Sequence, residues 1–215
     1  LPSGDVDPPT APIQRNGDVY LLKENVTLGY LDTLCVIQKG NIVIDGNGFE
    51  IKGAGESTGF YMSWDYYTLN VTFRHLTMKS VGQCIDASQM YVRGTKVLNS
   101  YFSTPWNLYL GYWEGITGWV NVSDNEFAGP GYLHGWEMWN CVIARNKFSN
   151  GSCSISLTEA PNSTIYENEG LSTLDLSNSP NCMIFNNTFA NPQGNAGMSI
   201  YSSRNVTISG NAATD

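Results

Sequence analysis

A nine-residue phrase recurs along most of this chain and limits its fold more than any other feature. Most copies share an apolar fourth residue, Asn at the seventh position and Phe at the ninth. The copies are residues 41–49, 70–78, 94–102, 119–127, 140–148, 162–170, 181–189 and 205–213. Their starts are 19 to 29 residues apart, a variable period that indicates stacked turns joined by loops of different length. We therefore expect a solenoid.

The inner positions of the phrase are expected to form apolar columns. Second and fourth residues are mostly apolar and alternate with the third, which is typical of a strand with one inward face. The fourth residues are Ile44, Phe73, Val97, Val122, Ile143, Ile165, Ile184 and Ile208. In coils stacked about 4.8 Å apart, these eight side chains should lie in one row.

The seventh position is expected to line a corner of each coil. Asparagine tolerates left-handed backbone angles, and its amide can bond to the coils on either side. The asparagines are Asn47, Asn125, Asn146, Asn168, Asn187 and Asn211. At the sixth position Asp124, Arg145 and Glu167 alternate in sign, so that opposite charges should stack outside, each pair contributing a few tenths of a kcal/mol.

With these features the chain resembles the right-handed parallel β-helix superfamily. That superfamily includes pectate-lyase-like and NosD-like proteins, carbohydrate-active β-helices and bacterial and archaeal surface proteins. The resemblance rests on residues 35–48 (CVIQKGNIVIDGNG) and on later endings such as residues 186–189 (NNTF), and it covers about residues 21–215. It implies an all-β, single-domain right-handed parallel β-helix of about nine coils, roughly 40 Å long. Because this fold carries lyases, hydrolases, adhesins and structural proteins, activity must be argued from a site.

The ends and the overall charge suggest domain organisation and location. Residues 1–17 hold four of the nine prolines, which favours an extended leader, with the β-helix over 18–215. A net charge of -8 without a basic run argues against nucleic acid as a partner. No apolar stretch approaches the roughly 20 residues of a membrane-spanning helix. A chain that starts with Leu fits a processed protein, so an extracellular or cell-surface location is expected.

Cysteine and histidine usage predicts neither a metal site nor a cofactor. The five cysteines lack metal-site spacing, and Cys141 and Cys182 would lie two coils, about 9.6 Å, apart, beyond the reach of a disulfide. They are expected to be buried thiols. His75 and His134 are the only histidines, which gives little support to a zinc site or a catalytic triad. Nucleotide-binding fingerprints are also missing from the sequence.

Aromatic residues gather between the phrases, in connections that occupy the same part of successive coils. The main ones are Trp64, Trp106, Tyr109, Trp113, Trp136 and Trp139. They are expected to form one broad aromatic face. Such a face could stack sugar rings, form an assembly interface, or simply pack long loops onto the coil.

Three acidic residues near these aromatics are weak catalytic candidates: Asp65, Glu114 and Glu137. Asp65 and Glu114 would lie two coils, about 9.6 Å, apart, at the upper edge for an inverting glycosidase. A lyase of the pectate type needs a carboxylate cluster beside an Arg or Lys base, and no tight Asp cluster accompanies Arg93 or Lys96. Solvated surface charges are the simpler interpretation, so the sequence leans away from an enzyme; if it is one, a glycoside hydrolase or polysaccharide lyase is expected.

Seven Asn-x-Ser/Thr sequons suggest surface glycosylation. They are Asn25, Asn70, Asn121, Asn150, Asn162, Asn186 and Asn205. Four of them, Asn25, Asn70, Asn162 and Asn205, begin a complete or imperfect copy of the phrase, where Asn could serve only to turn the chain.

Two hypotheses about function follow. The first is a glycosylated extracellular structural protein that self-associates into a filament, sheath or layer, because strand edges at the end of a solenoid can pair with another chain. The alternative is a β-helix that binds or cleaves polysaccharide, as a lectin, glycoside hydrolase or lyase. The expected partners are therefore copies of the chain itself and glycans.

Overall fold

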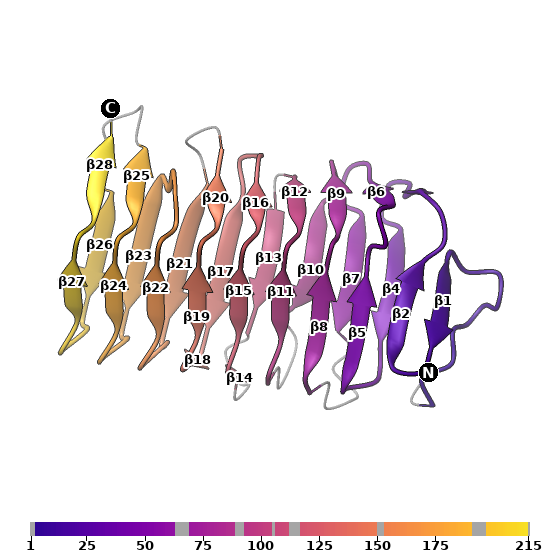
Figure 1. Ribbon diagram of the computed structural model, residues 1–215, viewed down its shortest axis with the longest axis horizontal. Helices are drawn as coiled ribbons and strands as arrows, with labels where there is room; N and C mark the ends of the chain where they lie inside the picture. The colour runs from indigo at the N-terminus through magenta and orange to yellow at the C-terminus, as the bar shows by residue number, and fades with distance from the viewer. Residues whose placement is uncertain are drawn as a thin grey trace.

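A computed structural model describes residues 3–62, 69–88, 93–104, 106–111, 117–149, 153–190 and 197–214. Their regular elements are strands, β1 to β28, which stack into a rod with the two termini at opposite ends (Figure 1). In these segments no helix is long and apolar enough to cross a membrane.

Three long sheets run along the rod, and two short pairs complete it. The ten-stranded sheet contains, in spatial order, β1 (Ile13–Asn16), β2 (Val19–Leu22), β5 (Ile42–Asp45), β8 (Val71–Arg74), β11 (Lys96–Leu98), β15 (Asn121–Ser123), β19 (Val142–Ala144), β22 (Thr164–Tyr166), β24 (Met183–Phe185) and β27 (Thr207–Ser209). The eight-stranded sheet contains β4 (Thr33–Ile37), β7 (Thr58–Met62), β10 (Gln83–Ala87), β13 (Trp106–Leu110), β17 (Tyr132–Trp136), β21 (Ser154–Thr158), β23 (Thr173–Ser177) and β26 (Met198–Tyr201).

The six-stranded sheet contains β3 (Val26–Thr27), β6 (Glu50–Lys52), β9 (Thr77–Lys79), β12 (Tyr101–Ser103), β16 (Glu126–Phe127) and β20 (Lys147–Phe148). The pairs are β14 (Thr117–Gly118) with β18 (Met138–Trp139), and β25 (Thr188–Ala190) with β28 (Ala212–Thr214). Neighbouring strands of the six- and eight-stranded sheets are parallel and come from successive coils. The expected parallel β-helix is confirmed.

The number of complete coils is slightly smaller than the nine expected. Among the described residues, seven coils place a strand on all three sides, namely those that begin at β2, β5, β8, β11, β15, β19 and β24. In the coil that begins at β22, isolated bridges mark the third side in place of a strand: Glu169 pairs with Lys147 and Leu171 with Phe189. The phrase there ends in Gly170 instead of Phe, and glycine has no side chain to hold a strand in the core.

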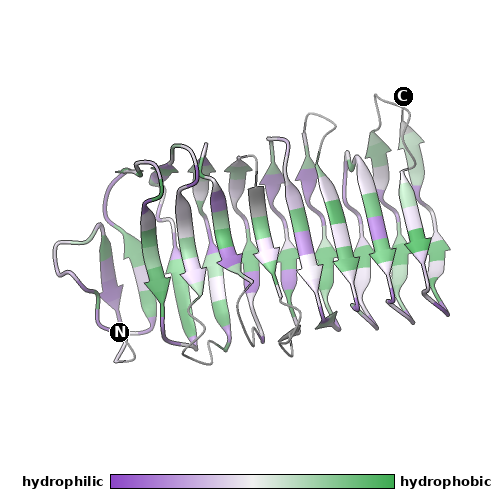
Figure 2. Ribbon diagram, turned by 180° about the vertical axis from the view of Figure 1, so that it is seen from behind, coloured by the Kyte–Doolittle hydropathy of each residue, from purple (hydrophilic) through white to green (hydrophobic). Residues whose placement is uncertain are grey.

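The predicted core column is present. Successive fourth residues are register partners from Ile44 through to Ile208, and all except Ile208 are buried. Apolar and polar residues accordingly alternate along the strands (Figure 2). The ninth-position rings of Phe102, Phe127 and Phe148 also stack, with centroids 5.3 and 5.0 Å apart.

The left-handed bends lie at positions one and six, so the bend expected at position seven was wrong for five of the six asparagines there. Every copy begins at a positive φ, for example 57° at Asn41. Position six also has a positive φ in the last seven copies, for example 53° at Arg145. Only the first copy bends at its seventh residue, Asn47. The bend at position six turns the next side chain into the rod, where Asn125 and Asn146 are 2% and 1% exposed.

The seventh residues form the expected ladder of hydrogen bonds. We call Asn125, Asn146, Asn168, Asn187 and Asn211 the asparagine ladder. Each amide nitrogen donates to the Oδ1 of the next member, at 3.0 Å from Asn125 to Asn146 and 2.9 Å at the following steps. Outside the ladder, Arg145 forms two bonds with Asp124, at 2.7 and 2.8 Å. The predicted stacking of opposite charges is therefore confirmed here.

Residues near the N-terminus pack onto the first coil. Strand β1 pairs antiparallel with β2, and Ile13 and Tyr20 are buried. Strand β1 lies within the expected leader, and the division of the chain at residue 17 stays a prediction. The five cysteines are free thiols, four of them buried.

Candidate functional site

The predicted aromatic residues that the structure describes occupy two places. Tyr109 and Trp136 lie on the eight-stranded sheet, and Trp139 lies on β18, at the bend that leads to the ten-stranded sheet. The backbone of Trp106 belongs to β13, but its side chain lies outside the description. Trp64 and Trp113 also lie outside the described residues.

Tyr109 belongs to a row of side chains on the outer face of the eight-stranded sheet. This outer row has one residue per coil: Tyr61, Asp86, Tyr109, His134, Ser156 and Asp175, each the register partner of the next. The flanking residues Phe60, Ile85 and Leu108 are fully buried. Because side chains alternate along a strand, the outer row faces away from the core.

Three rings form a cluster at the middle of this face. The centroids of Tyr109 and His134 are 5.4 Å apart, and His134 and Trp136 meet edge to face at 6.5 Å. Burial lowers the pKa of His134, so the imidazole is neutral at pH 7 and offers one donor and one acceptor. In the coil before that of Tyr109, the Asp86 carboxylate accepts two hydrogen bonds from Ser88, at 2.9 Å from its backbone N–H and at 2.5 Å from its hydroxyl.

The lowered pKa of His134 predicts a loss of stability in mild acid. Below the unfolded pKa of about 6.5, the unfolded chain takes up a proton that the folded chain resists, so the free energy of unfolding falls until the pH reaches the folded pKa. Urea unfolding at pH 7.5 and 5.5 should show a smaller pH effect in His134→Gln than in the wild type. An equal pH effect in both proteins would contradict this assignment.

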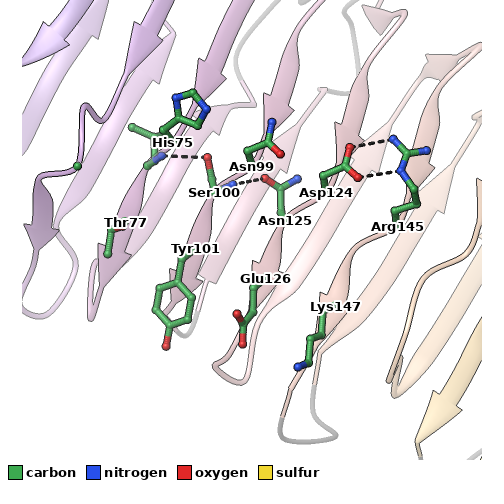
Figure 3. Close-up of a pocket in the computed structure, with 12 residues that line it drawn as sticks. His75, Thr77, Asn99, Ser100, Tyr101, Asp124, Asn125, Glu126, Arg145 and Lys147 are labelled. Carbon is green, nitrogen blue, oxygen red and sulfur yellow. Dashed lines mark hydrogen bonds and ion pairs between the residues drawn. The ribbon is translucent and has the colours of Figure 1, made fainter.

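A shallow hollow of 680 Å³ lies at the corner between the ten- and six-stranded sheets (Figure 3). Asn125, the first member of the asparagine ladder, lines it together with polar side chains that include His75, Tyr101, Glu126 and Lys147. The charges around it have both signs, and Arg145 is already bound to Asp124. The hollow is thus a polar surface without a dominant charge.

The catalytic candidates do not come together as a described site. Asp65 and Glu114 lie outside the described residues, so their spacing stays a prediction. Glu137 occupies the bend between β17 and β18 with a φ of 52°. Burial, and then the neighbouring Glu159, raise the pKa of its carboxyl. A single carboxyl with a raised pKa does not make a glycosidase pair, so a catalytic role for Glu137 stays a prediction.

The sequons are mostly accessible, and glycosylation stays a prediction. Asn25, Asn70, Asn162, Asn186 and Asn205 are exposed, Asn121 is half-buried, and Asn150 lies outside the described residues. Four of the exposed ones have left-handed φ values of 55° to 57°. The amides of Asn70 and Asn205 donate to Asn41 and Asn181, so the bends alone explain asparagine at these positions.

Comparison with known proteins relates the second half of the chain to a family of periplasmic proteins. Residues 114–215, slightly less than half of the chain, match the family described as NosD, Periplasmic copper-binding protein. Together with the parallel sheets, this match decides the superfamily. The chain belongs to the parallel β-helix superfamily. A periplasmic family supports, in coarse terms, a location of this β-helix outside the cytoplasm. No curated protein and no solved structure matches the chain significantly.

The described residues of this β-helix do not fit a copper site. No group of three or more His, Cys, Asp or Glu side chains among them could hold a metal ion. In the matched region His134 packs between aromatic rings, and burial raises the pKa of the Cys141 thiol to about 12. A thiol is a far weaker metal ligand than a thiolate. We therefore do not infer from the family's description that this chain binds copper.

Proposed function

We propose that this β-helix is an extracytoplasmic polysaccharide-binding protein that holds a sugar chain along its outer row. The observation that carries the proposal is the cluster of Tyr109, His134 and Trp136 on two adjacent strands. Aromatic rings offer flat apolar area with a polar handle, which suits the faces of sugar rings. A cluster built on strands is also held rigidly, so that little conformational entropy is lost on binding.

The polar members of the outer row support the same function. Ser156 and Asp175 follow His134 at one residue per coil, and Asp86 precedes Tyr109. Hydroxyl and carboxylate groups can bond to sugar hydroxyls. A polysaccharide that lies parallel to the rod axis would therefore meet a stacking or hydrogen-bonding group in each of the six coils of the outer row.

Replacement of Trp136 by alanine tests the proposal. We expect Trp136→Ala to weaken polysaccharide binding about tenfold, equivalent to about 1.4 kcal/mol, because a stacking surface is lost. Binding would be measured by calorimetry with polysaccharides first selected on a broad glycan array. Tyr30→Ala is the matched control, since Tyr30 is an exposed aromatic, at 64%, outside the outer row.

Two outcomes would end this proposal. The first is an array on which the folded chain binds no polysaccharide. The second is a polysaccharide bound equally well by the wild type and by Trp136→Ala.

Binding is favoured over cleavage because the described residues contain no carboxylate pair at the outer-row cluster. Self-association into a filament, sheath or layer stays a prediction. Such contact would cover Ile208, the last fourth-position residue, which is 51% exposed on β27.

A further inference from the structure

Trp119 interrupts a row of asparagines at one corner of the rod. The first residues of the phrase lie there, and amides bond from coil to coil, as from Asn70 to Asn41 at 2.8 Å and from Asn205 to Asn181 at 3.2 Å. Trp119 has the same left-handed backbone, with a φ of 61°, and its side chain is 70% exposed. An indole offers this row no acceptor, and an exposed ring adds little to folding. Tryptophan at this position therefore favours contact with another molecule.

A hollow of 420 Å³ lies beside Trp119, on the outer face of the ten-stranded sheet. Its lining includes one side chain from each of four successive coils, and each is the register partner of the next: Thr72, Lys96, Asn121 and Val142. At about 4.8 Å per coil these four side chains span about 14 Å, the length of about four residues of an extended chain. The hollow thus has the dimensions of a short peptide segment.

Two cations at this corner, Arg93 and Lys96, are exposed and have no ion-pair partner among the described residues. Elsewhere in the described chain, five cations form ion pairs with carboxylates: Arg15, Lys39, Arg74, Lys79 and Arg145. The chain has 19 acidic and only 11 basic residues, but no acidic residue is among the described residues that line the hollow. The complementary partner is therefore acidic.

A second tryptophan orients one of these cations. The guanidinium carbon of Arg93 lies 6.0 Å from the centroid of the Trp139 ring, and both residues pair with Gly118 on the coil between them. Because Gly118 has no side chain, Arg93 can reach across that coil to the ring. A stacked guanidinium can still present N–H groups to a carboxylate. Tryptophan and arginine are also the residues most enriched at the energetic centres of protein interfaces.

We propose that this corner docks an extended, acidic segment of a partner protein. The indole of Trp119 packs against an apolar side chain of the segment, while Arg93 and Lys96 face its carboxylates. The amides of Asn121 and Asn140, which also line the hollow, bond to its backbone. The corner lies on a different sheet from the outer row, so the inference goes beyond the proposed function and does not depend on it.

The test selects binders from a phage library of random linear peptides, with prior removal of those that bind Trp119→Asn. That variant loses the ring and carries the residue found in six other copies. The protein used has an intact mass that shows Asn70 and Asn121 unmodified. We expect the selected peptides to be rich in Asp and Glu beside an aromatic or large apolar residue. In calorimetry, Trp119→Asn should bind them at least tenfold more weakly than the wild type.

Two further variants separate charge from ring contact and this corner from other exposed aromatics. Lys96→Gln should weaken binding of a selected peptide, but not of its version with Gln and Asn in place of Glu and Asp. Tyr201→Asn, which removes an aromatic side chain that is 71% exposed on β26, should bind as the wild type does. Melting temperatures measured beside the wild type would show that the variants are folded.

Three outcomes would overturn the inference. The first is a selection that yields no peptide whose binding depends on Trp119. The second is a set of Trp119-dependent peptides without an excess of acidic residues. The third is binding to phosphatidylglycerol vesicles, but to no peptide, that is lost in Trp119→Asn, because the corner would then contact a lipid surface.

Discussion

Asn146→Ala is expected to lower the free energy of unfolding by about 3 kcal/mol, because the substitution breaks the asparagine ladder in the middle of the rod. Asn146 is 1% exposed. Its Oδ1 accepts bonds of 3.1 and 3.0 Å from the backbone and amide N–H of Asn125, and its own amide donates to Val122 O at 2.8 Å and to Asn168 Oδ1 at 2.9 Å. Alanine would leave buried groups in two neighbouring coils without these partners.

Urea unfolding of Asn146→Ala beside Asn181→Gly would test this interpretation. Asn181 is exposed, its φ is 61°, and its amide makes a longer bond of 3.3 Å to Asn162. Glycine tolerates that φ, so Asn181→Gly should change stability by less than about 1 kcal/mol. If the two variants lose similar amounts of stability, burial of the ladder contributes little to the fold.

The parts of the fold that repeat could be predicted from the sequence. A side chain that recurs once per coil has the same neighbours above and below, so the phrase alone places Ile143 beside Ile165 and Asn146 beside Asn168. The bend was assigned to the wrong residue because Asn is common at several positions of the phrase. Only the backbone shows that position six takes the left-handed angle even when it is Arg145.

The candidate sites depend on segments that do not repeat. The outer row comes from strands of the eight-stranded sheet, which loops of variable length separate from the phrase. The position of His134 relative to Tyr109 therefore could not be read from spacing. Trp119 lies inside the phrase, at a position that is Asn in six of the eight copies, and the sequence analysis drew nothing from it.

Phe127→Ala is expected to cost about 4 kcal/mol of folding free energy, within the range for deletion of a buried aromatic ring. Phe127 is 1% exposed and lies between Phe102 and Phe148, at interplanar angles of 18° and 11°. The cavity left by alanine would be bounded by rigid strands, so it could close only in part.

A second pair of stacked rings, on the outside of the rod, allows the stabilising effect of ring contact to be measured apart from that of burial. Tyr166 and Phe185 stack at 5.0 Å and 8° on the ten-stranded sheet, where both are partly exposed. Phe185→Ala should therefore cost only about 1 kcal/mol, the contribution of an aromatic pair without full burial. Chemical denaturation of both variants would decide the point. Equal losses would mean that ring stacking, rather than burial of the ninth residue, stabilises each coil against the next.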